Sequence, residues 1–256
     1  MPTYGNQTLG RGELHFSRFV GASLVPSGYL YIGNTPSFNL TVNSTNLDHF
    51  SSERGVREKD KSIIVETNRM AKFDADDIQM ENLAWFFLGS KATLTQTSAA
   101  AISETVVGVV QGLSYQLGVT NALPGGSKGI ANVVVTVAST PKVAGTDYLV
   151  DLDRGIITVL EGGGIANAAS ITVVYDKLAK SYDQVVSGSQ SVAGALQFRS
   201  YNPEGKSIDF LMPYVKLTPN GDFALKADNA WQSLPFNVEI LTAPARAAIY
   251  ANGAPY

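Results

Sequence analysis

The sequence predicts a mainly β protein with a single α-helix. Segments in which apolar and polar residues alternate recur along the chain, and 38–43 is the clearest near the N-terminus. The 24 glycines favour turns, and the many valine, isoleucine and threonine residues favour strands. Helical periodicity is convincing only once, near residues 76–88. Since 45% of the residues are hydrophobic and 16% are charged, we expect an ordered core over most of the 256 residues.

The N-terminal third predicts an arm followed by four strands. Residues 1–12 are small and polar, and we expect an arm that needs a partner to become ordered. The turn signal Pro26-Ser27-Gly28 separates the first two strands. Strands are expected at 14–20, 29–32, 38–43 and 61–73.

A charge-dense segment separates the third and fourth of these strands. Four acidic and four basic residues fall between positions 48 and 61, where few apolar residues are available for a core. We therefore expect residues 44–61 to form a long charged loop that projects from the core.

The single helix is predicted at about residues 76–88. Asp74 or Asp76 is placed to cap free backbone N–H groups at its start, and Gly89 is a natural stop at its end. The apolar residues at three- and four-residue spacing predict the buried face, formed by Ile78, Leu83, Ala84, Phe87 and Leu88.

The middle of the chain has the pattern of short strands, followed by a segment in which glycine-rich turns separate stronger β patterns. Short strands are expected at 93–96, 105–110 and 115–117, with a possible surface loop at 98–101. Between residues 121 and 180, glycine-rich turns bound four strongly β segments at 133–137, 148–151, 156–160 and 171–175. The turn Asp153-Arg154-Gly155 predicts a hairpin. These strands form either a small inserted module or part of one continuous sandwich.

The C-terminal part predicts further strands. A strand is expected at 208–217, where Pro213 marks an edge or a bulge. The Asn220-Gly221 pair predicts a tight hairpin that returns through Phe223 and Leu225. Strict alternation over 234–240 predicts one buried and one polar face.

Composition excludes several classes of function. The net charge of −3 argues against tight binding of nucleic acid, which normally needs an excess of lysine and arginine. Cysteine is absent, which excludes disulfides and thiol chemistry and fits synthesis in a reducing cytoplasm. The N-terminus lacks a signal-peptide pattern and no segment has the roughly 20 apolar residues that span a bilayer, so we expect no membrane association.

The search for catalytic, metal or cofactor motifs predicts none of them. The two histidines are His15 and His49, and Asp48 and two serines beside His49 in one loop are poor support for a catalytic triad. The pair Asp151 and Asp153 lacks the remaining ligands of a calcium loop. No glycine-rich segment opens a helix in the way that a nucleotide-binding loop does. We therefore expect a protein that is not an enzyme.

Taken together, the order of these features resembles the major tail tube protein of long-tailed, non-contractile bacteriophages. The segments that carry the resemblance are the strand pair at 28–33, the strand 38–43, the loop ending Arg57-Glu58-Lys59-Asp60, the helical segment 77–89, and the late segments 215–222 and 231–236. The resemblance covers roughly residues 14–120 and 181–245. It is one of pattern and order, because none of these segments is a catalytic fingerprint.

The resemblance implies a fold and a function. The fold is a β-sandwich or barrel with one flanking helix, built from residues 1–120 and 181–256, with 121–180 as an inserted module outside the tube. The function is that of a structural virion protein, assembled in the host cytoplasm into stacked hexameric rings that carry the genome into the host. The charged loop would set the register between subunits, through the contact residues Asp48, His49, Phe50, Glu53, Arg54, Arg57, Glu58, Lys59, Asp60 and Lys61.

The resemblance also implies partners, and other functions remain as alternatives to it. The partners are other copies of the chain, the tape measure, tail terminator and distal tail proteins, and double-stranded DNA that passes without specific binding. A carbohydrate-binding or adhesin module would also explain the β content, and another virion protein, such as a tail terminator or the tube of a contractile device, is a further alternative. A glycan-degrading enzyme would need two carboxylates facing each other across a cleft.

Overall fold

The computed structural model describes residues 7–53 and 55–253, and it divides into two compact units. Strands account for 53% and helices for 3% of the chain, which confirms a mainly β fold with one helix. Unit 1 comprises Met1–Ala92 and Val185–Tyr256, and unit 2 comprises Thr93–Gln184. No helix among the described residues is long and apolar enough to cross a membrane.

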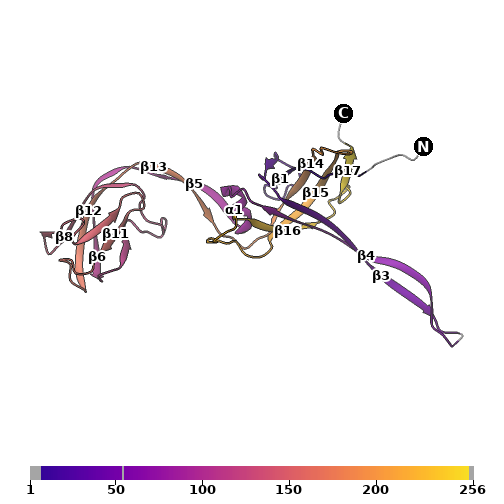
Figure 1. Cartoon of the computed structure of the whole chain (residues 1–256), viewed down its shortest axis with the longest axis horizontal. Helices are drawn as coiled ribbons and strands as arrows, with labels where there is room; N and C mark the ends of the chain where they lie inside the picture. The colour runs from indigo at the N-terminus through magenta and orange to yellow at the C-terminus, as the bar shows by residue number, and fades with distance from the viewer. Residues whose placement is uncertain (1–6, 54, 254–256) are drawn as a thin grey trace. The chain divides into compact units, whose positions relative to one another are not determined.

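Unit 1 is built on one antiparallel sheet in the order β2-β1-β14-β15-β16-β4-β3, with β17 paired to β15 (Figure 1). Its strands are β1 (Gly12–Arg18), β2 (Leu30–Tyr31), β3 (Ser37–Ser51), β4 (Glu58–Ala75), β14 (Val192–Ser200), β15 (Ile208–Pro219), β16 (Leu234–Ile240) and β17 (Tyr250–Gly253). The sheet does not close into a barrel, so the barrel alternative is wrong.

The core of unit 1 follows from the alternation that the sequence predicts. In β16 the residues Leu234, Phe236 and Val238 are completely buried, while the residues between them are not. Phe236 stacks on Phe73 with 4.9 Å between ring centroids. The proline in β15 is accommodated by a bulge, because the pairing with β14 shifts between Met212 and Val215.

The helix α1 (Met80–Phe86) is shorter than predicted and is not capped by Asp74 or Asp76. Both carboxylates have other partners, since Asp74 accepts a hydrogen bond from Ser37 and Asp76 accepts one from Asn34. The buried Asn82 anchors the helix instead, because its amide donates to the carbonyl of Ile32 at 2.6 Å.

The buried face of α1 also differs from the prediction. Trp85 and Phe86 enter the core, where Trp85 meets Phe16 edge-on at 4.9 Å, whereas Phe87 is exposed. The helix ends at Phe86, before the predicted end at 88; Leu88 adopts a positive φ, and the N–H of Gly89 donates to the carbonyl of Ala84.

Unit 2 contains two small sheets around a second core. One sheet has the order β6-β12-β8-β9 and the other β10-β11-β7. The strands are β6 (Ala99–Val109), β7 (Ser114–Gln116), β8 (Ile130–Val137), β9 (Thr140–Pro141), β10 (Tyr148–Asp151), β11 (Ile156–Val159) and β12 (Ala169–Lys177). The four strong strands are confirmed, as is the hairpin turn at 152–155 between β10 and β11. Residues 98–101, a possible loop, mostly belong to β6.

The boundaries of unit 2 lie outside the predicted 121–180. The reason is pairing: β6 lies beside β12 and β7 lies beside β11, so both earlier strands belong to the inserted unit. The strands β5 (Ser90–Gln96) and β13 (Lys180–Val186) pair with each other, and in them the chain passes from one unit to the other.

The predicted tight hairpin at Asn220-Gly221 is wrong, because β15 ends at Pro219 and β16 begins only at Leu234. Phe223 packs against the core of unit 1 near Phe86 and forms no strand. The segment between β15 and β16 therefore packs on unit 1 through the ring of Phe223 and not through strand pairing.

Candidate assembly interface

The most unusual element of unit 1 is the hairpin of β3 and β4, which extends beyond the rest of the sheet (Figure 1). The neighbouring strand β16 pairs with β4 only from Arg69 to Ala75. From the Asn43–Asn68 pair to the tip, the two strands have only each other. At about 3.3 Å per residue, 43–51 extends this part by roughly 30 Å. A two-stranded hairpin alone in water is marginally stable, and no other strand of the described residues supports this part.

Apolar side chains are exposed on both faces of this hairpin. Leu47 pairs directly with Ile63, so these two side chains share a face. Ile64 belongs to the next pair and lies on the opposite face. All three residues are at least half exposed. Neither face is covered by the chain itself, so a partner that covered the hairpin would bury apolar surface on two sides.

The charges near the tip are mostly paired across the two strands. Lys59 contacts Asp48 at 2.7 Å, and the Ser62 hydroxyl donates to the same carboxylate at 2.6 Å. The bond from Lys59 and then the bond from Ser62 lower the pKa of Asp48 below its usual value. His49 lies 2.6 Å from Asp60, and Arg57 lies over the ring of Phe50. These contacts fix the shape of the tip in a part that has no core.

The structure brings most of the predicted contact residues together, but not in a loop. Asp48, His49 and Phe50 end β3, while Glu58, Lys59, Asp60 and Lys61 begin β4. Glu53 and Arg57 lie in the turn, and Arg54 lies outside the described residues. The prediction of a loop over 44–61 is therefore wrong for the described residues except 52–53 and 55–57. Charged side chains of the two strands pair with each other, Lys59 with Asp48 and His49 with Asp60, which is compatible with strand structure.

Sequence reasoning missed the apolar residues of this interface. It assigned Ile63 and its neighbours to a strand over 61–73 and did not include them among the contact residues, yet Ile63, Ile64 and Val65 are all exposed. The available signal was that three consecutive apolar residues place side chains on both faces of a strand. Such a strand requires cover on both sides, and the charge-rich hairpin around it has none.

The hairpin also carries free sheet edges. β3 is the last strand of the sheet along its whole length, and β4 has an open edge from Asn68 towards the tip. Unpaired N–H and C=O groups on such edges can pair with another chain. The other end of this sheet has the two residues of β2, and in unit 2 β6 is also an edge strand, with 11 residues. With the 15 residues of β3, the hairpin has the longest of these edges.

No arrangement suited to catalysis or metal binding stands out in the part of the chain that the structure describes. The described residues include no cluster of three or more histidine, aspartate or glutamate side chains that could hold a metal ion. Asp151 pairs with Arg154 and Asp153 with Lys180, as expected of a solvated turn. The carboxylate beside His49 is exposed, and neither neighbouring serine is bonded to that ring.

Comparison with known proteins assigns the chain to a family. Residues 7–253 match the model of the family described as "Protein of unknown function UCP028589", and the chain belongs to this family. The match includes both units and the complete hairpin. No curated protein matches the sequence.

Proposed function

We propose that this chain is the tail tube subunit of a long-tailed, non-contractile bacteriophage. In this role copies assemble into rings, with six copies in each, and the rings stack into the conduit through which DNA leaves the virion. The tape measure, tail terminator and distal tail proteins would contact the same tube.

The observation that carries the proposal is the β3–β4 hairpin. It exposes apolar side chains on both faces and open strand edges along its length, which is an unfavourable surface for a protein that works alone. In an assembly of many copies the same surface becomes buried, so its composition is explained. A monomeric adhesin or glycan-binding module gives no reason for this hairpin.

Charge supports the proposal in a second way. A bore that DNA must pass through has to avoid cations that bind phosphate, and the chain has 22 acidic against 19 basic residues. Two cations of the hairpin are also engaged, Lys59 in an ion pair with Asp48 and Arg57 in the contact with the ring of Phe50. The mild negative charge is compatible with passage of DNA without specific binding.

A variant that lacks the tip of the β3–β4 hairpin tests the proposed function. A variant in which an Asn-Gly turn replaces residues 50–59 keeps the core of unit 1, so we expect the same circular dichroism and the same melting temperature. Light scattering should then show rings that no longer stack. Stacking at the wild-type concentration would refute the role of the hairpin.

The matched control changes another exposed hairpin in the same manner. Ala138 and Ser139 form the turn between β8 and β9, and both have a positive φ. Replacing them with Asn-Gly suits that backbone and leaves unit 1 untouched. We expect this variant to stack normally.

A further inference from the structure

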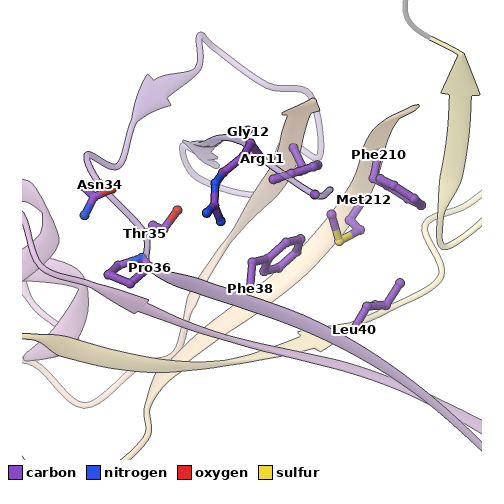
Figure 2. A pocket seen from close by; sticks show the side chains of 11 residues that line it. Arg11, Gly12, Asn34, Thr35, Pro36, Phe38, Leu40, Phe210 and Met212 are labelled. Atoms are coloured by element: carbon purple, nitrogen blue, oxygen red, sulfur yellow. The ribbon is translucent and has the colours of Figure 1, made fainter. Parts of the chain in front are cut away.

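A pocket of about 460 Å³ opens in unit 1 where the curved sheet does not close. It brings together strands that are not neighbours in the sheet, since it is lined by β3 and also by β14 and β15. Phe38 of β3 stacks on Phe198 of β14 with ring centroids 5.7 Å apart, although these strands share no hydrogen bonds. The edge strand β3 therefore curls back over the sheet and leaves an opening beside the start of β1 (Figure 2).

The pocket has an apolar floor and one unpaired cation. Its floor is formed by the aromatic residues Phe38, Phe198 and Phe210 with Met212. Figure 2 shows Arg11 extending from the segment before β1 towards the space above Phe38. The Arg11 guanidinium makes no ion pair with any described residue, while the backbone N–H of Arg11 donates to Asn202 and its backbone carbonyl accepts from Tyr201. A fitting occupant presents an apolar side chain next to a carboxylate.

The tip of the β3–β4 hairpin presents that combination. Val56 is 71% exposed and projects from the turn. Glu53 and Glu58 flank it, and neither makes an ion pair with a described residue, whereas Asp48 and Asp60 are paired within the hairpin. The tip thus offers two carboxylates that make no ion pair with a described residue, beside Lys61, which makes none either, and the pocket offers one such cation, Arg11.

A chain cannot place this tip in its own pocket. Phe38 in the pocket and Ser51 near the tip lie on one continuous strand, 13 residues apart (51 − 38). At about 3.3 Å per residue the two ends are separated by roughly 43 Å. The contact must therefore join two copies. Because it joins different surfaces of the two copies, it repeats from copy to copy in a ring or a stack.

We propose that the hairpin tip of one copy, with Val56 and the adjacent carboxylates, seats in this pocket of a second copy beside Arg11. The inference rests on the proposed function, because it identifies the receiving surface for the same hairpin. It makes the contact between copies directional, with a tip donor and a pocket acceptor in each chain.

Disulfide trapping tests the contact, since the chain has no cysteine of its own. One population carries Val56→Cys and the other Thr35→Cys, at the pocket wall. When the two are mixed, assembled and oxidised, we expect a linked dimer of twice 27.2 kDa. The matched control pairs Val56→Cys with Leu225→Cys, which is 79% exposed in unit 1 but outside the pocket, and should give no dimer above background.

A charge exchange tests the same contact without cysteines. Arg11→Glu places like charges together and should raise the concentration needed for assembly about a hundredfold. Combining it with Glu53→Arg and Glu58→Arg should restore assembly. Failure of this rescue, with Arg11→Glu still folded, would contradict the pairing.

The outcomes separate this inference from the proposed function. If tubes form but Val56→Cys and Thr35→Cys do not link, the pocket assignment is overturned and the proposed function stands. If a cysteine at Thr3 links to Thr35→Cys within one chain and Val56→Cys does not, the pocket belongs to the chain's own first residues and the inference is also overturned. If no copies associate at any concentration, both fall together.

Discussion

Replacing the exposed apolar residues of the hairpin should abolish assembly without unfolding the chain. The variant Leu47→Ser, Ile63→Ser, Ile64→Ser alters side chains from residues that are 61%, 50% and 66% exposed. Complete burial of such a side chain contributes about 1.5–3 kcal/mol, so covering the exposed part of all three contributes about 3–5 kcal/mol. Since each 1.4 kcal/mol changes an equilibrium constant tenfold, association should weaken by roughly a hundredfold to ten-thousandfold.

Sedimentation velocity over a concentration series measures this effect. The variant should remain monomeric at concentrations where the wild type assembles, with its thermal transition nearly unchanged because the replaced side chains face water in the monomer. The matched control is Val107→Ser, Leu149→Ser, Leu152→Ser, which removes similarly exposed side chains from unit 2. Assembly of the hairpin variant at the wild-type concentration would show that these residues are not the contact.

Three further predictions concern the folded chain. Gly89→Ala should destabilise unit 1 by about 1–3 kcal/mol, because a Cβ there would overlap the carbonyl oxygen of Val186, while Gly125→Ala has open space and should be neutral in denaturant titrations. Phe236→Ala should lower the free energy of unfolding of unit 1 by about 3–5 kcal/mol and its melting temperature by roughly 6–20 °C. Calorimetry should show the transition of unit 2 unchanged, and an equal shift of both transitions would contradict two separate cores. Folding lowers the pKa of Asp48, so the stability that this carboxylate contributes is present above the usual pKa of 3.8 and is lost as the pH falls through the lowered pKa. Replacing the lysine partner of Asp48 should raise the pKa of Asp48 in a carboxyl NMR titration.

The alternation of apolar and polar residues predicted the buried strands well. Residues 234–240 and 148–151 form strands at those bounds, and the first has the buried face that was expected. In these segments local pattern and tertiary burial agree, because each strand has a core on one side. The hairpin turn between β10 and β11 could be predicted from its own residues, because Gly155 adopts the positive φ that such a turn requires.

Other features depend on contacts that a single sequence does not reveal. Asp74 and Asp76 were expected to cap the helix but bond to Ser37 and Asn34, which belong to an earlier segment of the chain. The hairpin was expected to be a loop because its charges suggested solvent. Those charges pair across two strands instead, and a charge-rich strand differs little in composition from a loop.

The central claim is that copies of this chain assemble into stacked rings through the β3–β4 hairpin. Electron microscopy of the purified full-length chain at high concentration tests it most directly. The account predicts rings and tubes, with the hairpin of each copy seated against another copy. A homogeneous monomer of 27.2 kDa at every concentration, which also fails to form tubes with other tail components, would contradict it.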